Sequence, residues 1–178
     1  MVIDVNTENH TYQGKQILEY KNNSPDTLNR VFYHLFFNAF RPNSEQVLAS
    51  KYATFERRGV AEKIASLKSE DWGLVEINKL LQDGSPVSFN VEETILEVVL
   101  NTPLLPNSST TFEMDFFTQT PLVMQRSGKK NKDGVEFSMS QWYPKLCEYD
   151  FEGWHANPYI GREFHGVWGD FDVTINID

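Results

Sequence analysis

Short runs in which apolar and polar residues alternate, separated by turn residues, constrain this chain more than any other feature of its sequence. Phe112, Met114 and Phe116 alternate with polar residues. Because successive strand side chains point to opposite faces, such a run predicts a half-buried strand. Comparable runs lie at 3–5, 12–20, 31–36, 74–80, 87–91 and 94–100. With no strand–helix–strand rhythm and no internal repeat, the pattern indicates an all-β, antiparallel sandwich or curved sheet.

One segment departs from the strand pattern. Ser44 precedes Glu45 and Gln46, and a serine oxygen that accepts from free backbone amides commonly begins a helix. The residues that follow have poor periodicity, and Gly59 interrupts them. We therefore expect a short helical or irregular excursion near 44–68. A length of 178 residues is enough for one well-buried core, so we expect a single domain over 1–178.

The last residues have the cleanest alternation of the chain. Phe171, Val173, Ile175 and Ile177 are expected to point inward, with polar residues between them pointing outward. This pattern predicts a buried strand that ends at the last residue. Natural domains seldom end in the middle of a sheet, so the chain is expected to be a fragment of a longer multidomain protein.

Composition and charge argue against a nucleic-acid partner and against a membrane-spanning segment. The net charge of −9 repels phosphate backbones, so no nucleic-acid partner is expected. No run of 18 or more apolar residues occurs, so no membrane span is expected. The first residues lack the basic and apolar regions of a signal peptide. The single cysteine fits a reducing cytoplasm and a disulfide-free periplasmic or secreted location equally well, which leaves the compartment open.

A local basic cluster does not change this conclusion. Its residues stand among glycines and an asparagine: Arg126, Lys129, Lys130 and Lys132. This composition is typical of a solvated loop tip.

The stretch 137–178 is rich in residues that can carry chemistry. It contains Trp142, Trp154, Trp168, His155, His165 and the only cysteine, Cys147. His155 and His165 stand among several acids, but their spacing matches neither HExxH nor HxH, so we expect no metal on this chain. Cys147 precedes Glu148, and a neighbouring carboxylate disfavours the thiolate, so a buried, inert thiol is expected.

Other catalytic signatures are missing or unspecific. A pair of carboxylates suits glycoside hydrolysis, but acids are plentiful in so acidic a chain. No GxSxG, GxGxxG or P-loop motif is present. From the residues alone, the stretch 137–178 is interpreted as a site or an interface, and a hydrolase with its own carboxylate or histidine site stays an alternative.

Two segments carry a resemblance to a known family. Residues 20–43 read YKNNSPDTLNRVFYHLFFNAFRPN, and residues 140–175 read SQWYPKLCEYDFEGWHANPYIGREFHGVWGDFDVTI. Together they resemble the N-terminal domain of aminopeptidase-N-like (gluzincin) zinc metallopeptidases of a bacterial branch. The resemblance implies a curved, saddle-like antiparallel sandwich followed by a thermolysin-like catalytic domain. It also implies a peptide substrate, and zinc that is bound by HExxH and a later glutamate.

The motif of the catalytic domain does not occur here, since the chain contains no HExxH. The resemblance therefore implies a domain that caps the active site and is inactive alone, with zinc in the missing catalytic domain and that domain as its partner. The HExxH motif is expected downstream in the same reading frame. Its absence there would contradict the resemblance.

The resemblance also implies substrate-binding residues. In the family, a Glu or Gln just before an aromatic-Pro pair helps to bind the free α-amine of the substrate. Gln141 stands in that position, directly before Trp142-Tyr143-Pro144, with a shorter spacer than usual; Glu136 is the alternative anchor. An amide oxygen accepts from an ammonium more weakly than a carboxylate does. Four other residues are carried over as structural: Trp154, His155, Tyr159 and Phe164.

A different class of function remains open from the sequence. The three tryptophans of the stretch 137–178 also suit a free-standing binding module for a peptide or a glycan. Titration of the isolated chain with such ligands separates the two hypotheses, because only the binding module requires affinity without a catalytic domain.

Overall fold

The computed structural model describes residues 1–50, 52, 55–122, 127–161 and 166–178. The strands are β1 (Val2–Asn6), β2 (Thr11–Lys21), β3 (Leu28–His34), β4 (Leu74–Gln82), β5 (Ser85–Pro86), β6 (Ser88–Glu92), β7 (Ile95–Leu104), β8 (Ser109–Gln119), β9 (Gly128–Lys129), β10 (Phe137–Ser138), β11 (Lys145–Leu146), β12 (Tyr149–Asp150), β13 (Gly153–Trp154) and β14 (Thr174–Ile177). The helices are α1 (Glu45–Ser50) and α2 (Phe55–Ala65), with 3₁₀ turns η1 (Phe36–Ala39) and η2 (Ser69–Asp71).

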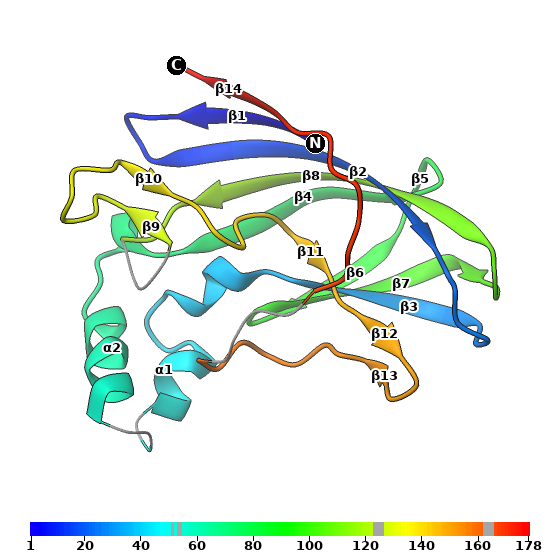
Figure 1. Cartoon of the computed structure of the whole chain (residues 1–178), viewed down its shortest axis with the longest axis horizontal. Helices are drawn as coiled ribbons and strands as arrows, with labels where there is room; N and C mark the ends of the chain where they lie inside the picture. Colours follow the sequence, from blue (N-terminus) through cyan, green and yellow to red (C-terminus); the bar gives the residue numbers. More distant parts are fainter. Residues whose placement is uncertain (51, 53–54, 123–126, 162–165) are drawn as a thin grey trace.

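Two sheets form the body of the molecule (Figure 1). The larger sheet has the order β14-β1-β2-β8-β4-β5, and the smaller has the order β11-β3-β7-β6. Their strand pairs are antiparallel except β1–β14, which is parallel. The two helices lie together at one end of the sandwich. The structure confirms the antiparallel β-sandwich and the helical excursion near 44–68.

The core lies between the two sheets. Along β8, buried and partly exposed residues alternate, and Phe112, Met114 and Phe116 are each 1% exposed. The ring of Phe112 meets that of Tyr33 from the smaller sheet edge-on, with 6.3 Å between their centroids. The alternation thus correctly predicted which face of β8 is buried.

His34 and Cys147 are both buried, and for Cys147 this agrees with the expected buried, inert thiol. His34 is buried and stacks on Phe36 with 4.7 Å between the ring centroids. Cys147 is 1% exposed, and burial raises the pKa of its thiol to about 12. A thiol in this state is a weak nucleophile at neutral pH.

The interpretation of the basic cluster is wrong for Lys129. This side chain is buried, and its Nζ donates to the backbone carbonyl of Glu70 and lies 3.4 Å from Asp71 Oδ1. Burial is possible because these oxygens satisfy the ammonium group. Lys130 and Lys132 are exposed, as expected of a loop tip, and Arg126 lies outside the described residues.

The prediction of a buried C-terminal strand is also wrong. Strand β14 forms, but every one of its residues is exposed, and Ile175 and Ile177 are 53% and 67% exposed. It pairs with β1 at the edge of the larger sheet, beyond the reach of the smaller one. Alternation shows which side chains share a face of a strand, whereas their burial requires a second layer to cover that face.

Among the described residues, no helix combines the length and the apolar composition needed to cross a bilayer.

Candidate functional site

A two-stranded hairpin, β12–β13, brings together polar residues from the stretch 137–178. Tyr149 pairs with Trp154, and Asp150 pairs with Gly153. One step further from the turn, the backbone N–H of His155 donates to the carbonyl of Glu148 over 2.9 Å. Since residues opposite each other and residues two apart share a face, Glu148, Asp150 and His155 lie on the same face of the hairpin.

The other face of the hairpin holds it against the sandwich. Trp154 contacts Tyr149, Phe32 and Tyr20, with ring centroids 5.1, 5.8 and 6.4 Å apart. Trp154 and Tyr149 are partly buried and pack against the core. Trp154 is thus structural, as the resemblance implied.

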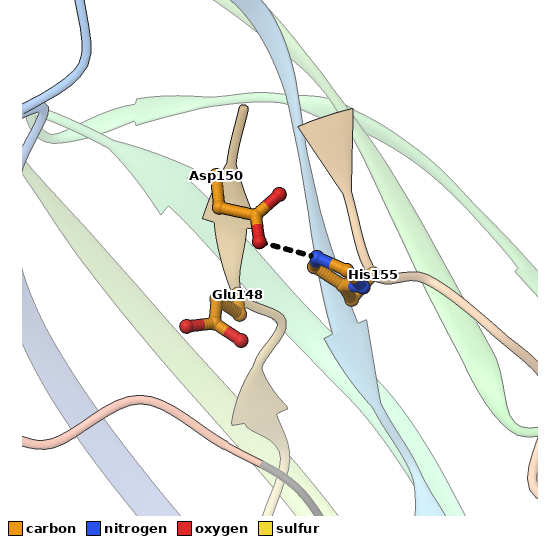
Figure 2. A group of neighbouring side chains, drawn as sticks. All are labelled: Glu148, Asp150 and His155. Carbon is orange, nitrogen blue, oxygen red and sulfur yellow. Dashed lines mark ion pairs between the residues drawn. The ribbon is translucent and has the colours of Figure 1, made fainter. Parts of the chain in front are cut away.

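The polar face forms a compact group of possible metal ligands (Figure 2). His155 Nε2 lies 2.9 Å from Asp150 Oδ2, and ligand atoms of Glu148, Asp150 and His155 lie within 4.8 Å of one another. Hydrogen bonding to Asp150 raises the pKa of His155, and the charges of Asp150, Glu148 and Glu152 act in the same direction. One imidazole and two carboxylates thus lie close enough together to share a cation.

The sequence interpretation missed this group because it paired His155 with His165, which lies outside the described residues. The usable signal was the turn. Phe151 and Glu152 precede Gly153, which has a φ of +97°, a conformation that glycine adopts without strain. A hairpin centred there places Glu148 opposite His155.

An open cavity of about 710 Å³ adjoins the hairpin. It lies between β2 and the C-terminal segment, and Asp150 belongs to both the cavity and the polar group. Its aromatic lining includes Tyr20, Tyr143, Tyr149, Phe151, Trp168 and Phe171. Trp168 is fully exposed, whereas Trp142 and Trp154 pack against the core.

Gln141 occupies a constrained backbone position. Its φ is +54°, which is uncommon for a residue other than glycine. The side chain is partly exposed, and its Oε1 accepts from Lys145 Nζ over 3.4 Å. Burial lowers the pKa of Lys145. The amide oxygen of Gln141 therefore already faces an amine nitrogen.

Glu136, the alternative anchor, has a different partner. Its Oε2 lies 2.6 Å from His10 Nε2, and the ring of His10 lies against Phe137 with 5.3 Å between centroids. The carboxylate of Glu136 is thus engaged near β10, while Gln141 contacts Lys145 at β11.

Two further residues were carried over from the resemblance as structural, Tyr159 and Phe164. Tyr159 is 7% exposed, and its ring meets that of Phe36 edge-on. The backbone N–H of Tyr159 donates to Thr94 Oγ1. These contacts agree with a structural role. Phe164 lies outside the described residues.

Comparisons with known proteins give matches only among solved structures, since no protein-family model and no curated protein matches the chain. The matching structures include M1 zinc metallopeptidases. They include a two-domain mutant bound to L-tryptophan (15% identity, TM-score 0.46), a two-domain mutant bound to L-arginine (14%, 0.47) and a mutant from Deinococcus radiodurans bound to a Tyr-Ser-Ala substrate (14%, 0.46). Each match covers 79% of this chain, which spans 24–25% of the length of those structures. These structures are of the class that the two sequence motifs resemble.

Proposed function

We propose that this chain is a non-catalytic domain of a zinc aminopeptidase-like metallopeptidase, which caps the active site and helps to anchor the N-terminus of the peptide substrate. The two segments 20–43 and 140–175 support the class of protein. The observation that carries the anchoring role is the position of Gln141, whose amide oxygen faces an amine nitrogen.

Gln141 is the better anchor of the two candidates. Its contact with Lys145 is long, at 3.4 Å, and its left-handed backbone is a form of strain that is often found at functional sites. Glu136 is held by His10 at 2.6 Å, so binding a substrate amine would require it to give up that contact.

Zinc and the general base belong to the catalytic domain that the proposal places downstream of Asp178. The reading frame beyond Asp178 is therefore expected to encode HExxH. If it does not, the proposal fails whatever the properties of Gln141.

In the full-length protein, Gln141→Ala is expected to raise KM for a peptide with a free N-terminus about tenfold and to leave kcat almost unchanged. A hydrogen bond to a charged group contributes about 1.5–3 kcal/mol, and about 1.4 kcal/mol corresponds to a factor of ten. A loss that affects KM alone indicates substrate binding rather than chemistry. Steady-state kinetics on an aminoacyl chromogenic substrate measure the effect.

Two controls separate anchoring from general damage. Gln141→Glu should lower KM, because a carboxylate binds an ammonium more strongly than an amide does. An N-acetylated peptide, assayed as a competitive inhibitor, should bind the wild type and Gln141→Ala equally well. Equal weakening of both peptides would rule out an anchoring role.

The cavity beside the hairpin favours a second candidate function, a binding module for a peptide or a glycan. Under this candidate, the isolated chain binds a ligand from a glycan or peptide library, and Trp168→Ala weakens that binding about two- to tenfold, because an aromatic contact offers about 0.5–1.5 kcal/mol beyond the area that it buries. Trp72→Phe is the matched control, since Trp72 donates to the carbonyl of Leu67 and does not line the cavity. No binding by the isolated chain would remove this candidate.

A further inference from the structure

The polar face of the β12–β13 hairpin has the composition and geometry of a metal site. We infer that Glu148, Asp150 and His155 bind a divalent first-row transition-metal ion, for which Zn²⁺ is the probe. The site is independent of the zinc that the proposed function places in another domain. It also includes neither Gln141 nor Lys145, which that residue contacts.

The separations of the ligand atoms are close to those found around a single ion. Zinc binds histidine nitrogen and carboxylate oxygen at about 2.0–2.2 Å, so two ligands on one ion lie about 3–3.5 Å apart. His155 Nε2 and Asp150 Oδ2 are separated by 2.9 Å. The ligand atoms of all three residues lie within 4.8 Å of one another, so an ion between them requires only small side-chain adjustments.

The packing of the hairpin also holds the three side chains on one fixed face. Trp154 and Tyr149 pack against the sandwich from the opposite face, which fixes the direction of the polar face. Gly153 stands opposite Asp150, and a Cβ there would meet nothing within 4 Å. The space on this side of Gly153, opposite Asp150, is therefore open.

The donor set selects the class of metal. Imidazole suits zinc and other first-row transition ions, while all-oxygen sites suit calcium and magnesium. Three protein ligands leave at least one position of a tetrahedral ion open to water. Because Asp150 also lines the 710 Å³ cavity, that open position is accessible to a molecule that occupies the cavity.

Isothermal titration calorimetry of the 178-residue chain with zinc chloride tests the inference. We expect one Zn²⁺ per chain with a micromolar Kd, and at least a hundredfold weaker binding of Mg²⁺. Glu148→Gln, Asp150→Asn and His155→Gln should each weaken Zn²⁺ binding at least tenfold. Each variant places a neutral polar side chain at a partly exposed position of the hairpin, and circular dichroism checks that the fold is retained.

Glu152→Gln is the matched control. It removes one negative charge from the same hairpin, but Glu152 is exposed at the turn and contributes only its backbone N–H to Asp150. Because the exposed carboxylate of Glu152 acts on His155 only through its charge, the affinity of this variant for Zn²⁺ should stay within about threefold of that of the wild type. In an NMR titration, Co²⁺ should broaden the backbone amide signals of 148–155 first.

Three results would overturn the inference. The first is the absence of saturable Zn²⁺ uptake. The second is an affinity that the three ligand substitutions leave unchanged, which would place the ion elsewhere. The third is an equal loss of Zn²⁺ affinity in Glu152→Gln, which would show that the affinity depends on the net charge of the hairpin and not on the three ligands.

Discussion

Gly14→Ala is expected to lower the free energy of unfolding by about 3 kcal/mol, because overpacking a dense core typically costs about 1–3 kcal/mol. Gly14 pairs with Phe116 across β2 and β8, and an added Cβ would lie 2.1 Å from Phe116 Cζ. The ring cannot move aside freely, since it is 1% exposed and meets Tyr12 edge-on at 6.5 Å. Urea denaturation, monitored by tryptophan fluorescence, measures the loss in the free energy of unfolding.

The same substitution at another glycine provides the control. A Cβ added at Gly59, within α2, would meet nothing within 4 Å, and alanine favours a helix over glycine by about 1 kcal/mol. Gly59→Ala should therefore stabilise the chain slightly. A stability of Gly14→Ala equal to that of the wild type would mean that Gly14 does not face Phe116, and that the register of β2 against β8 is wrong.

Gly14 also illustrates what local sequence can and cannot predict. The alternation around it correctly predicted strand β2, and Gly14 marks no bulge in that strand, since its register with β1 and β8 is continuous. The glycine instead makes room for a ring that is 102 residues away in sequence (116 − 14). Such a contact depends on which strands become neighbours, and this is not encoded in the residues around Gly14.

The same limit explains the other differences. The burial of Lys129 depends on oxygens of Glu70 and Asp71, and the exposure of β14 depends on the extent of the opposite sheet. By contrast, the group of Glu148, Asp150 and His155 follows from one local turn. It was therefore predictable from sequence, provided that the hairpin was recognised before the spacing of the histidines was considered.

Residue Asn38 links the two sheets through its side chain. It is 1% exposed; its Oδ1 accepts from the backbone N–H of Val75 over 2.8 Å, and its Nδ2 donates to the carbonyl of Glu93 over 3.0 Å. Val75 belongs to β4 of the larger sheet, and Glu93 stands in the turn between β6 and β7 of the smaller sheet. One amide thus satisfies backbone groups from both layers.

Asn38→Leu is expected to lower the free energy of unfolding by about 2–5 kcal/mol. Leucine has a similar volume but leaves the N–H of Val75 and the carbonyl of Glu93 without this partner, and an unsatisfied buried group costs about 1–3 kcal/mol. For a domain of this size, each 1 kcal/mol lowers Tm by about 2–4 °C. Differential scanning calorimetry and urea denaturation give the change independently.

Two further variants assign the loss to the two hydrogen bonds. Asn38→Asp keeps an acceptor for Val75 but brings a carboxylate against the carbonyl of Glu93, so it should destabilise the chain more at pH 7 than at pH 4, where protonation restores a donor. Asn101→Leu removes an exposed amide that donates to the carbonyl of Pro86 over 2.7 Å. Because water can replace that bond, its loss should stay below about 1 kcal/mol. Equal losses at Asn38 and Asn101 would show that Asn38 does not link buried groups of the two sheets.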